Sequence, residues 1–117
     1  MRNNVELGLK WTVEPGDRST VVHISGEIDL GTHEDFADAA RAGLRTPAPV
    51  VVVDLARVTY LGSVGLRVLT RANDEARQAG RMVRVVDGSA IVHRIMEVCG
   101  LEQVLSLYPT VADARSA

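Results

Sequence analysis

The sequence predicts a single α/β domain over residues 1–117, built on a mixed, mainly parallel sheet of 4–5 strands with 3–4 helices. Segments typical of strands and helices alternate along most of the chain, which favours parallel strands joined by helical crossovers. The β-branched run Val50–Val53 suits a central strand buried on both faces. The turn signal Pro15–Arg18 separates two strand-like segments, so an antiparallel N-terminal strand should open the sheet.

Two strands are expected first. Apolar and polar residues alternate over 5–13, which indicates a half-buried strand with Trp11 in the hairpin core. In the second strand, Val22, Ile24 and Ile28 share one face. The two strands should pair as a hairpin.

The first helix is expected to begin after Thr32. This residue fits an N-cap, with Asp35 three positions on in an acidic variant of the capping box. Apolar residues then recur at helical spacing until the prolines at 47 and 49 end the pattern. They are Phe36, Ala39, Ala40 and Leu44.

The central strand should end near Leu55, and a short polar connection should lead to a helix that Gly80 closes. The inner face of that helix is predicted to carry Leu69, Ala72, Ala76 and Ala79.

The C-terminal part is predicted to hold a strand, a helix, a weak strand and a tail helix. The expected features are a strand over Met82–Val86, a cap region at Asp87–Ser89, a buried stripe of Ile91, Ile95 and Val98 beside a packed Cys99, a helix end at Gly100, a strand over Val104–Leu107 and a cap at Thr110.

Composition excludes several classes of function. The net charge of −2 and the aromatic content of 3% argue against nucleic-acid binding. A single cysteine excludes an internal disulfide and a cysteine-based zinc site. No run approaches the roughly 20 apolar residues that cross a bilayer. We therefore expect a cytoplasmic protein with no cofactor, no metal and no membrane contact.

Function in open α/β sheets gathers at the carboxyl ends of the strands. The corresponding segments are Asp29–Thr32, Thr59–Gly65 and Asp87–Ser89. Among their residues, Ser63 lies at the junction between a strand and a helix, and its residue type allows three interpretations.

Ser63 fits a helix N-cap without any further function. A nucleophile is the second interpretation, because Ser63 and Gly65 match the end of the G-x-S-x-G elbow. Leu61 replaces the first glycine of that motif, however, and the three histidines are poorly placed as bases, so an enzyme is not expected. The third interpretation is a phosphate acceptor, because free N–H groups and the helix dipole tolerate a phosphate there.

Three motifs resemble the bacterial anti-sigma-factor antagonists, which are STAS domain proteins. Residues 54–69, DLARVTYLGSVGLRVL, resemble their D-L-S-x-V pattern that runs on to D-S-x-G-L. Residues 26–29, GEID, followed by Thr32, and residues 99–101, CGL, are similar to two further family segments. The resemblance covers about residues 5–114, and the element order agrees.

The resemblance implies a non-enzymatic regulator. The unphosphorylated protein would bind an anti-sigma factor that is also a serine kinase, and so release a sigma factor. Phosphorylation of Ser63 would end that binding, and a serine phosphatase would restore it. The implied partner-binding residues are Asp29, Thr32, Gly62, Ser63, Gly65 and Leu66.

Gly62 departs from the family pattern, which has an acidic residue before the serine. A glycine there could instead serve a tight turn with positive φ. The departure keeps an alternative open, in which the chain is a STAS-like accessory or scaffold subunit of a transporter, lipid-trafficking or signalling complex and is not phosphorylated.

Overall fold

The five strands form one sheet whose spatial order is the order along the chain, β1-β2-β3-β4-β5. The computed structural model describes residues 8–117. Only the β1–β2 pair is antiparallel, and the remaining pairs are parallel, which confirms the predicted mixed sheet. The strands are β1 (Lys10–Glu14), β2 (Ser19–Ile28), β3 (Val50–Leu61), β4 (Met82–Val86) and β5 (Ser106–Tyr108). The helices are α2 (His33–Leu44), α3 (Ser63–Gln78), α4 (Ala90–Val98) and α5 (Val111–Ser116), with a 3-10 turn η1 (Leu101–Gln103).

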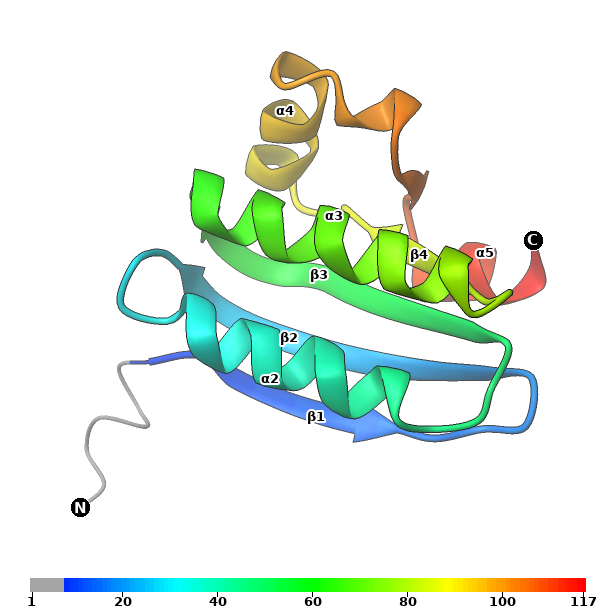
Figure 1. Ribbon diagram of the computed structural model, residues 1–117. Helices are drawn as coiled ribbons and strands as arrows, with labels where there is room; N and C mark the ends of the chain where they lie inside the picture. The colour runs from blue at the N-terminus through cyan, green and yellow to red at the C-terminus, as the bar shows by residue number, and fades with distance from the viewer. Residues whose placement is uncertain (1–7) are drawn as a thin grey trace.

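Helices cover the two faces of the sheet unequally. In Figure 1, α2 and α3 lie side by side over one face, with both of their N-termini at the same end of the molecule. Side chains from α2, α3 and α4 bury that face in the main core, including Phe36, Leu69 and Met96. A smaller cluster on the other face packs Val52 of β3 under Ala114 of α5. The valine run is therefore buried on both faces, as predicted.

Strand β3 is longer than the sequence pattern indicated. Where a polar connection was expected after Leu55, the strand continues to Leu61 and pairs with β2 up to Ile28. Buried Val58 and Leu61 fix this extension against the core, while the polar residues between them face solvent. Strand β4 ends opposite Asp54. The ladder of β2 and β3 therefore runs well past the end of β4.

The edge strand differs from prediction in extent and in burial. It begins at Lys10, and the predicted residues 5–7 lie outside the described part of the chain. Trp11 is 37% exposed, so the expectation that it fills the hairpin core is wrong. Strand β1 has a neighbour on one side only, which leaves the indole partly open to solvent.

Helix α4 is rotated relative to the predicted stripe. Val92 and Met96 are buried, whereas Ile91 and Val98 are 46% and 74% exposed. The predicted buried stripe is therefore wrong at Ile91 and Val98, because packing against β3 selects the neighbouring stripe, whereas Ile95 is partly buried against the main core. Ser89 Oγ accepts the N–H of Val92 at 3.1 Å, as expected for a cap, and Thr110 Oγ1 accepts that of Asp113.

Three smaller expectations also changed. Ala79 and Cys99 are exposed rather than packed, and the last strand begins at Ser106 because η1 occupies part of the preceding segment. The predicted helix ends hold: Gly80 and Gly100 have φ values of +72° and +68°, which favour glycine.

Candidate functional site

Two of the three predicted segments meet at the carboxyl end of the sheet. Gly62 N–H donates to the carbonyl of Ile28 at 2.8 Å, which joins the turn after β2 to the start of α3. The third segment, Asp87–Ser89, lies elsewhere. A Cβ on Gly88 would stand 3.6 Å from Cβ of Ala56, in the middle of β3. The long β3 therefore separates the Asp87 region from the Ser63 end.

Ser63 is the first residue of α3, and its side chain is exposed. The N-cap is Gly62, so the interpretation of Ser63 as the cap is wrong. The N–H groups of Gly65 and Leu66 both donate to the carbonyl of Gly62. The N–H groups of Ser63 and Val64 precede these bonds and have no intrahelical acceptor. An oxygen-rich group on the Ser63 hydroxyl would therefore meet free donors and the positive end of the helix dipole.

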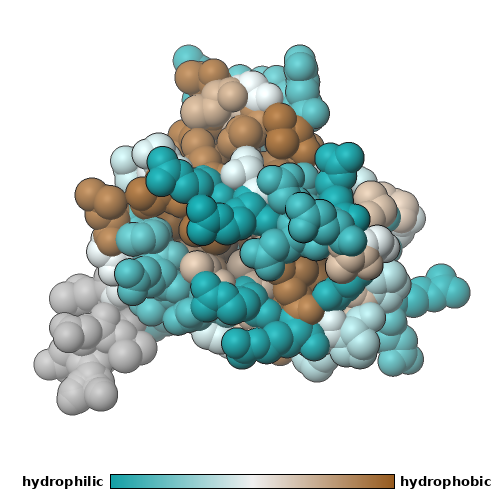
Figure 2. Space-filling model, in the orientation of Figure 1, coloured by the Kyte–Doolittle hydropathy of each residue, from teal (hydrophilic) through white to brown (hydrophobic). Residues whose placement is uncertain are grey.

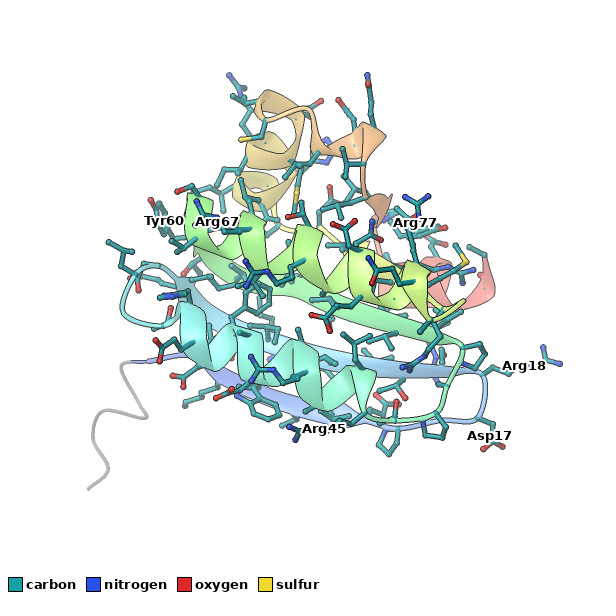
Figure 3. All side chains as sticks on the ribbon, viewed as in Figure 1. Asp17, Arg18, Arg45, Tyr60, Arg67 and Arg77 are labelled. Carbon is teal, nitrogen blue, oxygen red and sulfur yellow. The ribbon has the colours of Figure 1, made fainter. Side chains whose placement is uncertain are left out.

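Gly62 lies against the aromatic ring of Tyr60. The backbone of Gly62 has φ −84° and ψ 172°, which any residue adopts, so the interpretation that Gly62 serves a positive φ is wrong. A Cβ at this position would instead stand 3.4 Å from Cε2 of Tyr60 and 3.7 Å from its hydroxyl. Tyr60 is 47% exposed and lies beside the start of α3 in Figure 3.

The turn between β2 and α2 is held by Thr32. Its hydroxyl donates to the carbonyl of Glu27 at 2.7 Å and accepts the N–H of Asp29 at 3.0 Å. Asp29 Oδ1 accepts the N–H of Gly31 at 2.9 Å. Thr32 stands at the N-cap position but makes no side-chain bond to the helix, so the predicted capping box is wrong. The turn presents Leu30 to solvent with 78% of its surface exposed.

Gly65 and Leu66 lie beneath this surface rather than on it. Gly65 is buried, and a Cβ there would stand 2.6 Å from both Cγ2 of Ile28 and Cδ1 of Leu61. Leu66 is partly buried and packs against the main core. These two residues set how closely α3 approaches the sheet, and so where Ser63 stands.

Each of the three histidines has a partner other than Ser63. His33 Nδ1 lies 3.0 Å from the carbonyl of Leu30. His93 Nδ1 lies 2.9 Å from Asp87 Oδ2, and this carboxylate raises the pKa of His93. Within residues 8–117, no hydrogen bond joins a histidine to Ser63. Among the described residues, no histidine is therefore positioned to activate Ser63 as a nucleophile.

His23 links three elements on the face of the sheet opposite α2 and α3. Its Nε2 lies 2.9 Å from Glu14 Oε1, and its Nδ1 lies 2.8 Å from Asp54 Oδ2. Arg115 of α5 also reaches Glu14. The hydrogen bond to Glu14, followed by that to Asp54, raises the pKa of His23, and the same bond lowers the pKa of Glu14. Together with Arg115, the cluster joins β1, β2, β3 and α5.

A shallow groove of about 330 Å³ runs between α2 and α3. Ala37, Ala40 and Val64 contribute apolar surface to it, and Arg67 and Arg71 lie along its α3 side. Figure 2 shows apolar areas among hydrophilic side chains on this face, and a larger apolar area over α4. The groove starts next to Ser63, because Val64 is one of its lining residues.

The sequence pattern did not mark Leu30, Tyr60 or Arg67. Leu30 carries a signal in retrospect, because a leucine between Asp29 and Gly31 in a tight turn has little chance of burial. No cluster of three or more metal-ligating side chains occurs within residues 8–117. No helix in that part of the chain is long and apolar enough to span a membrane.

Comparisons with known proteins agree on one family. The family model described as "Mlab, STAS domain" matches residues 11–108. The chain is 34% identical over 116 residues to the anti-sigma-F factor antagonist RsfA of Mycobacterium tuberculosis, covering 97% of this chain and 90% of the relative. A crystal structure of an anti-sigma factor antagonist from Mycobacterium paratuberculosis superposes with a TM-score of 0.84 at 33% identity, covering 92% of each chain.

A more distant structure, the unphosphorylated anti-sigma factor antagonist SpoIIAA, has a TM-score of 0.67 at 16% identity over 90% of this chain and 92% of that one. It supports the fold alone. With a matching family model across most of its length and a relative above 30% identity, the chain belongs to the STAS domain family.

Proposed function

We propose that this protein is an anti-sigma-factor antagonist, which binds an anti-sigma factor with serine kinase activity through the surface around Ser63. Binding would free the sigma factor that the anti-sigma factor otherwise holds. The observation that carries the proposal is an exposed serine at the first position of α3, in a chain 34% identical to an anti-sigma-F factor antagonist. The names of the relatives, which describe regulators, support the proposal.

The contact surface in this proposal comprises Ser63, Gly62 and the turn Asp29–Thr32, together with the exposed side chains of Leu30 and Tyr60. Leu30 and Tyr60 supply apolar area that a partner can bury. Asp29 and Thr32 act mainly by fixing the turn, since both are engaged in hydrogen bonds within it. Gly65 and Leu66 act from below by positioning α3.

Phosphorylation of Ser63 would end the binding. The kinase transfers the γ-phosphoryl group of ATP to Ser63 Oγ; the hydroxyl proton passes to a base of the kinase, and ADP leaves. The product carries about two negative charges at the centre of the contact surface. The fold tolerates them because the free N–H groups of α3 face the phosphate. A like-charged or apolar partner surface would then lose affinity, and a serine phosphatase would restore it by hydrolysis.

A binding assay with the cognate kinase, with and without ATP, tests this proposal. We expect Ser63→Ala to bind in both conditions and Ser63→Asp to bind at least tenfold more weakly than the parent. Ser116→Asp is the matched control, because it adds the same charge on exposed α5. The proposal fails when Ser63→Asp binds like Ser116→Asp and ATP releases neither the parent nor Ser63→Ala.

The accessory-subunit alternative rests on Gly62, which lacks the carboxylate that the family has at this position. It would show itself as stable co-purification with a membrane ATPase or a large assembly, with intact mass revealing no phosphate on the protein. Mapping by fragmentation after incubation with ATP and candidate kinases distinguishes the two functions.

A further inference from the structure

Arg67 follows Ser63 by one turn on the solvent-facing side of α3. The two residues are four apart, a spacing that places their Cβ atoms about 5–6 Å from each other on a helix surface. Both side chains are exposed, and Figure 3 shows Arg67 over the first turns of α3, beside Tyr60. Within residues 8–117, no carboxylate forms a salt bridge with Arg67. Its guanidinium is therefore available to an anionic partner.

We infer that Arg67 exchanges anionic partners when Ser63 is phosphorylated. In the unphosphorylated protein, its guanidinium pairs with a carboxylate of the bound kinase. In the phosphorylated protein, the guanidinium instead pairs with the phosphate on Ser63 and no longer contacts the kinase. This inference rests on the proposed function of Ser63 and gives that switch a second component besides repulsion.

Geometry and charge favour the phosphate in this competition. A guanidinium can donate two parallel N–H bonds to phosphate oxygens. The anion precedes the cation by four residues, which is the better orientation for an ion pair on a helix. The phosphate carries about twice the charge of a carboxylate at neutral pH and is tethered to the same helix turn. Capture therefore needs no movement of the backbone.

No other arginine of α3 can replace Arg67 in this role. Arg71 lies two turns from Ser63, at an axial distance of about 12 Å. Arg77 lies in the last turn of the helix, far from Ser63 in Figure 3. Arg77 is exposed like Arg67 and shares its helix, so it offers a matched control.

The first test measures capture without any partner. The full chain is prepared with phosphoserine installed at position 63, and the phosphate is titrated by ³¹P NMR. A nearby cation favours the dianion, so we expect Arg67→Gln to raise the second phosphate pKa by about 0.3 and Arg77→Gln to leave it unchanged. An equal pKa in Arg67→Gln and Arg77→Gln would overturn the inference.

The second test measures the other half of the exchange. Unphosphorylated Arg67→Gln should bind the cognate kinase about three- to fivefold more weakly than the parent at low salt, and Arg77→Gln should bind like the parent. Binding by Arg67→Gln at parental strength would overturn the inference even when Ser63 is the phosphoacceptor. Conversely, failure of any kinase to modify Ser63 would reject the proposed function, whereas the ³¹P titration would still report on capture.

Discussion

The ring of Tyr60 lies over Gly62, so that a Cβ added to the glycine would stand 3.4 Å from Cε2 of the tyrosine. This is an ordinary van der Waals distance, and the backbone of Gly62 is in a region open to every residue. The aromatic ring therefore covers the position at which the family pattern has an acidic side chain. Around Ser63, this chain presents aromatic and apolar surface where a carboxylate would otherwise stand.

Gly62→Asp should fold and should be more stable than Gly62→Ala. Both substitutions reduce the freedom of the unfolded chain, but only the aspartate supplies an oxygen to the free N–H groups at the start of α3. We expect the free energy of unfolding to differ between the two variants by about 1 kcal/mol, measured by urea denaturation. Equal stability would mean that the Tyr60 ring keeps the carboxylate away from the helix end.

Leu30→Ala and Tyr60→Ala should each weaken binding of the cognate kinase about tenfold or more while leaving the fold intact. Both side chains are exposed, so truncation removes apolar contact with a partner rather than core packing. Val98→Ala is the control, because Val98 is 74% exposed on α4, close to the 78% of Leu30. Calorimetric titration checks the affinities; a parental affinity for both site variants would remove these residues from the contact surface.

Gly65→Ala should destabilise the protein by about 1–3 kcal/mol, because its methyl group would overlap Ile28 and Leu61 at 2.6 Å. Relief requires α3 to move away from the sheet, which also shifts Ser63. Thermal unfolding provides the measurement. Gly31→Ala serves as control, since its nearest contact is Asp29 Oδ1 at 3.4 Å and its effect should be small. A Gly65→Ala variant as stable as Gly31→Ala would contradict the tight packing.

His23 should make stability depend on pH near neutrality. Its pKa in the folded protein is raised above 6.5, chiefly by the hydrogen bond to Glu14 and then by Asp54. The protonated ring therefore stabilises the fold fully below about pH 6.5, and this contribution is lost as pH rises through the folded pKa. We expect the free energy of unfolding to fall between about pH 6 and about pH 8, and His23→Gln to reduce that fall.

His93 acts in the same direction, because Asp87 raises its pKa as well. The effect of His23→Gln is therefore measured in a His93→Gln background, as the change in the free energy of unfolding by urea between about pH 6 and about pH 8. Glu14 changes the pH dependence of stability only at lower pH: because its pKa is lowered, the ionised carboxylate stabilises the fold above the ordinary carboxyl range, and this contribution is lost as pH falls through the folded pKa. An unchanged pH profile on adding His23→Gln would show that the bridge has no net effect.

The order of the elements was readable from the sequence because turns and caps are local. Two kinds of feature that depend only on neighbouring residues were predicted correctly. They are the glycines that end α3 and α4, and the caps at Ser89 and Thr110. The extension of β3 was not, because its polar residues resemble a loop unless the pairing with β2 is known. Local rules contain no information about that partner.

The phase of α4 shows a second limit. Ile91, Val92, Ile95 and Met96 form two adjacent apolar stripes, and either would satisfy a helical pattern. Only packing against β3 selects Val92 and Met96. The same limit applies to Ser63. The sequence does not distinguish the N-cap from the first helical residue, because the two positions are adjacent. Tyr60 was not marked because an exposed apolar residue within a strand has no signature of its own in a sequence, whereas the turn that exposes Leu30 could have been recognised.

Gly62 is the only residue between β3 and α3, so no flexible loop carries the hydroxyl of Ser63. A short peptide copied from this region would have the same letters but neither the helix turn nor Leu30, which comes from a distant part of the chain. A kinase that recognises this surface must therefore read a folded substrate. Modification would then be confined to correctly folded molecules, and denatured or truncated copies would stay outside the signalling cycle.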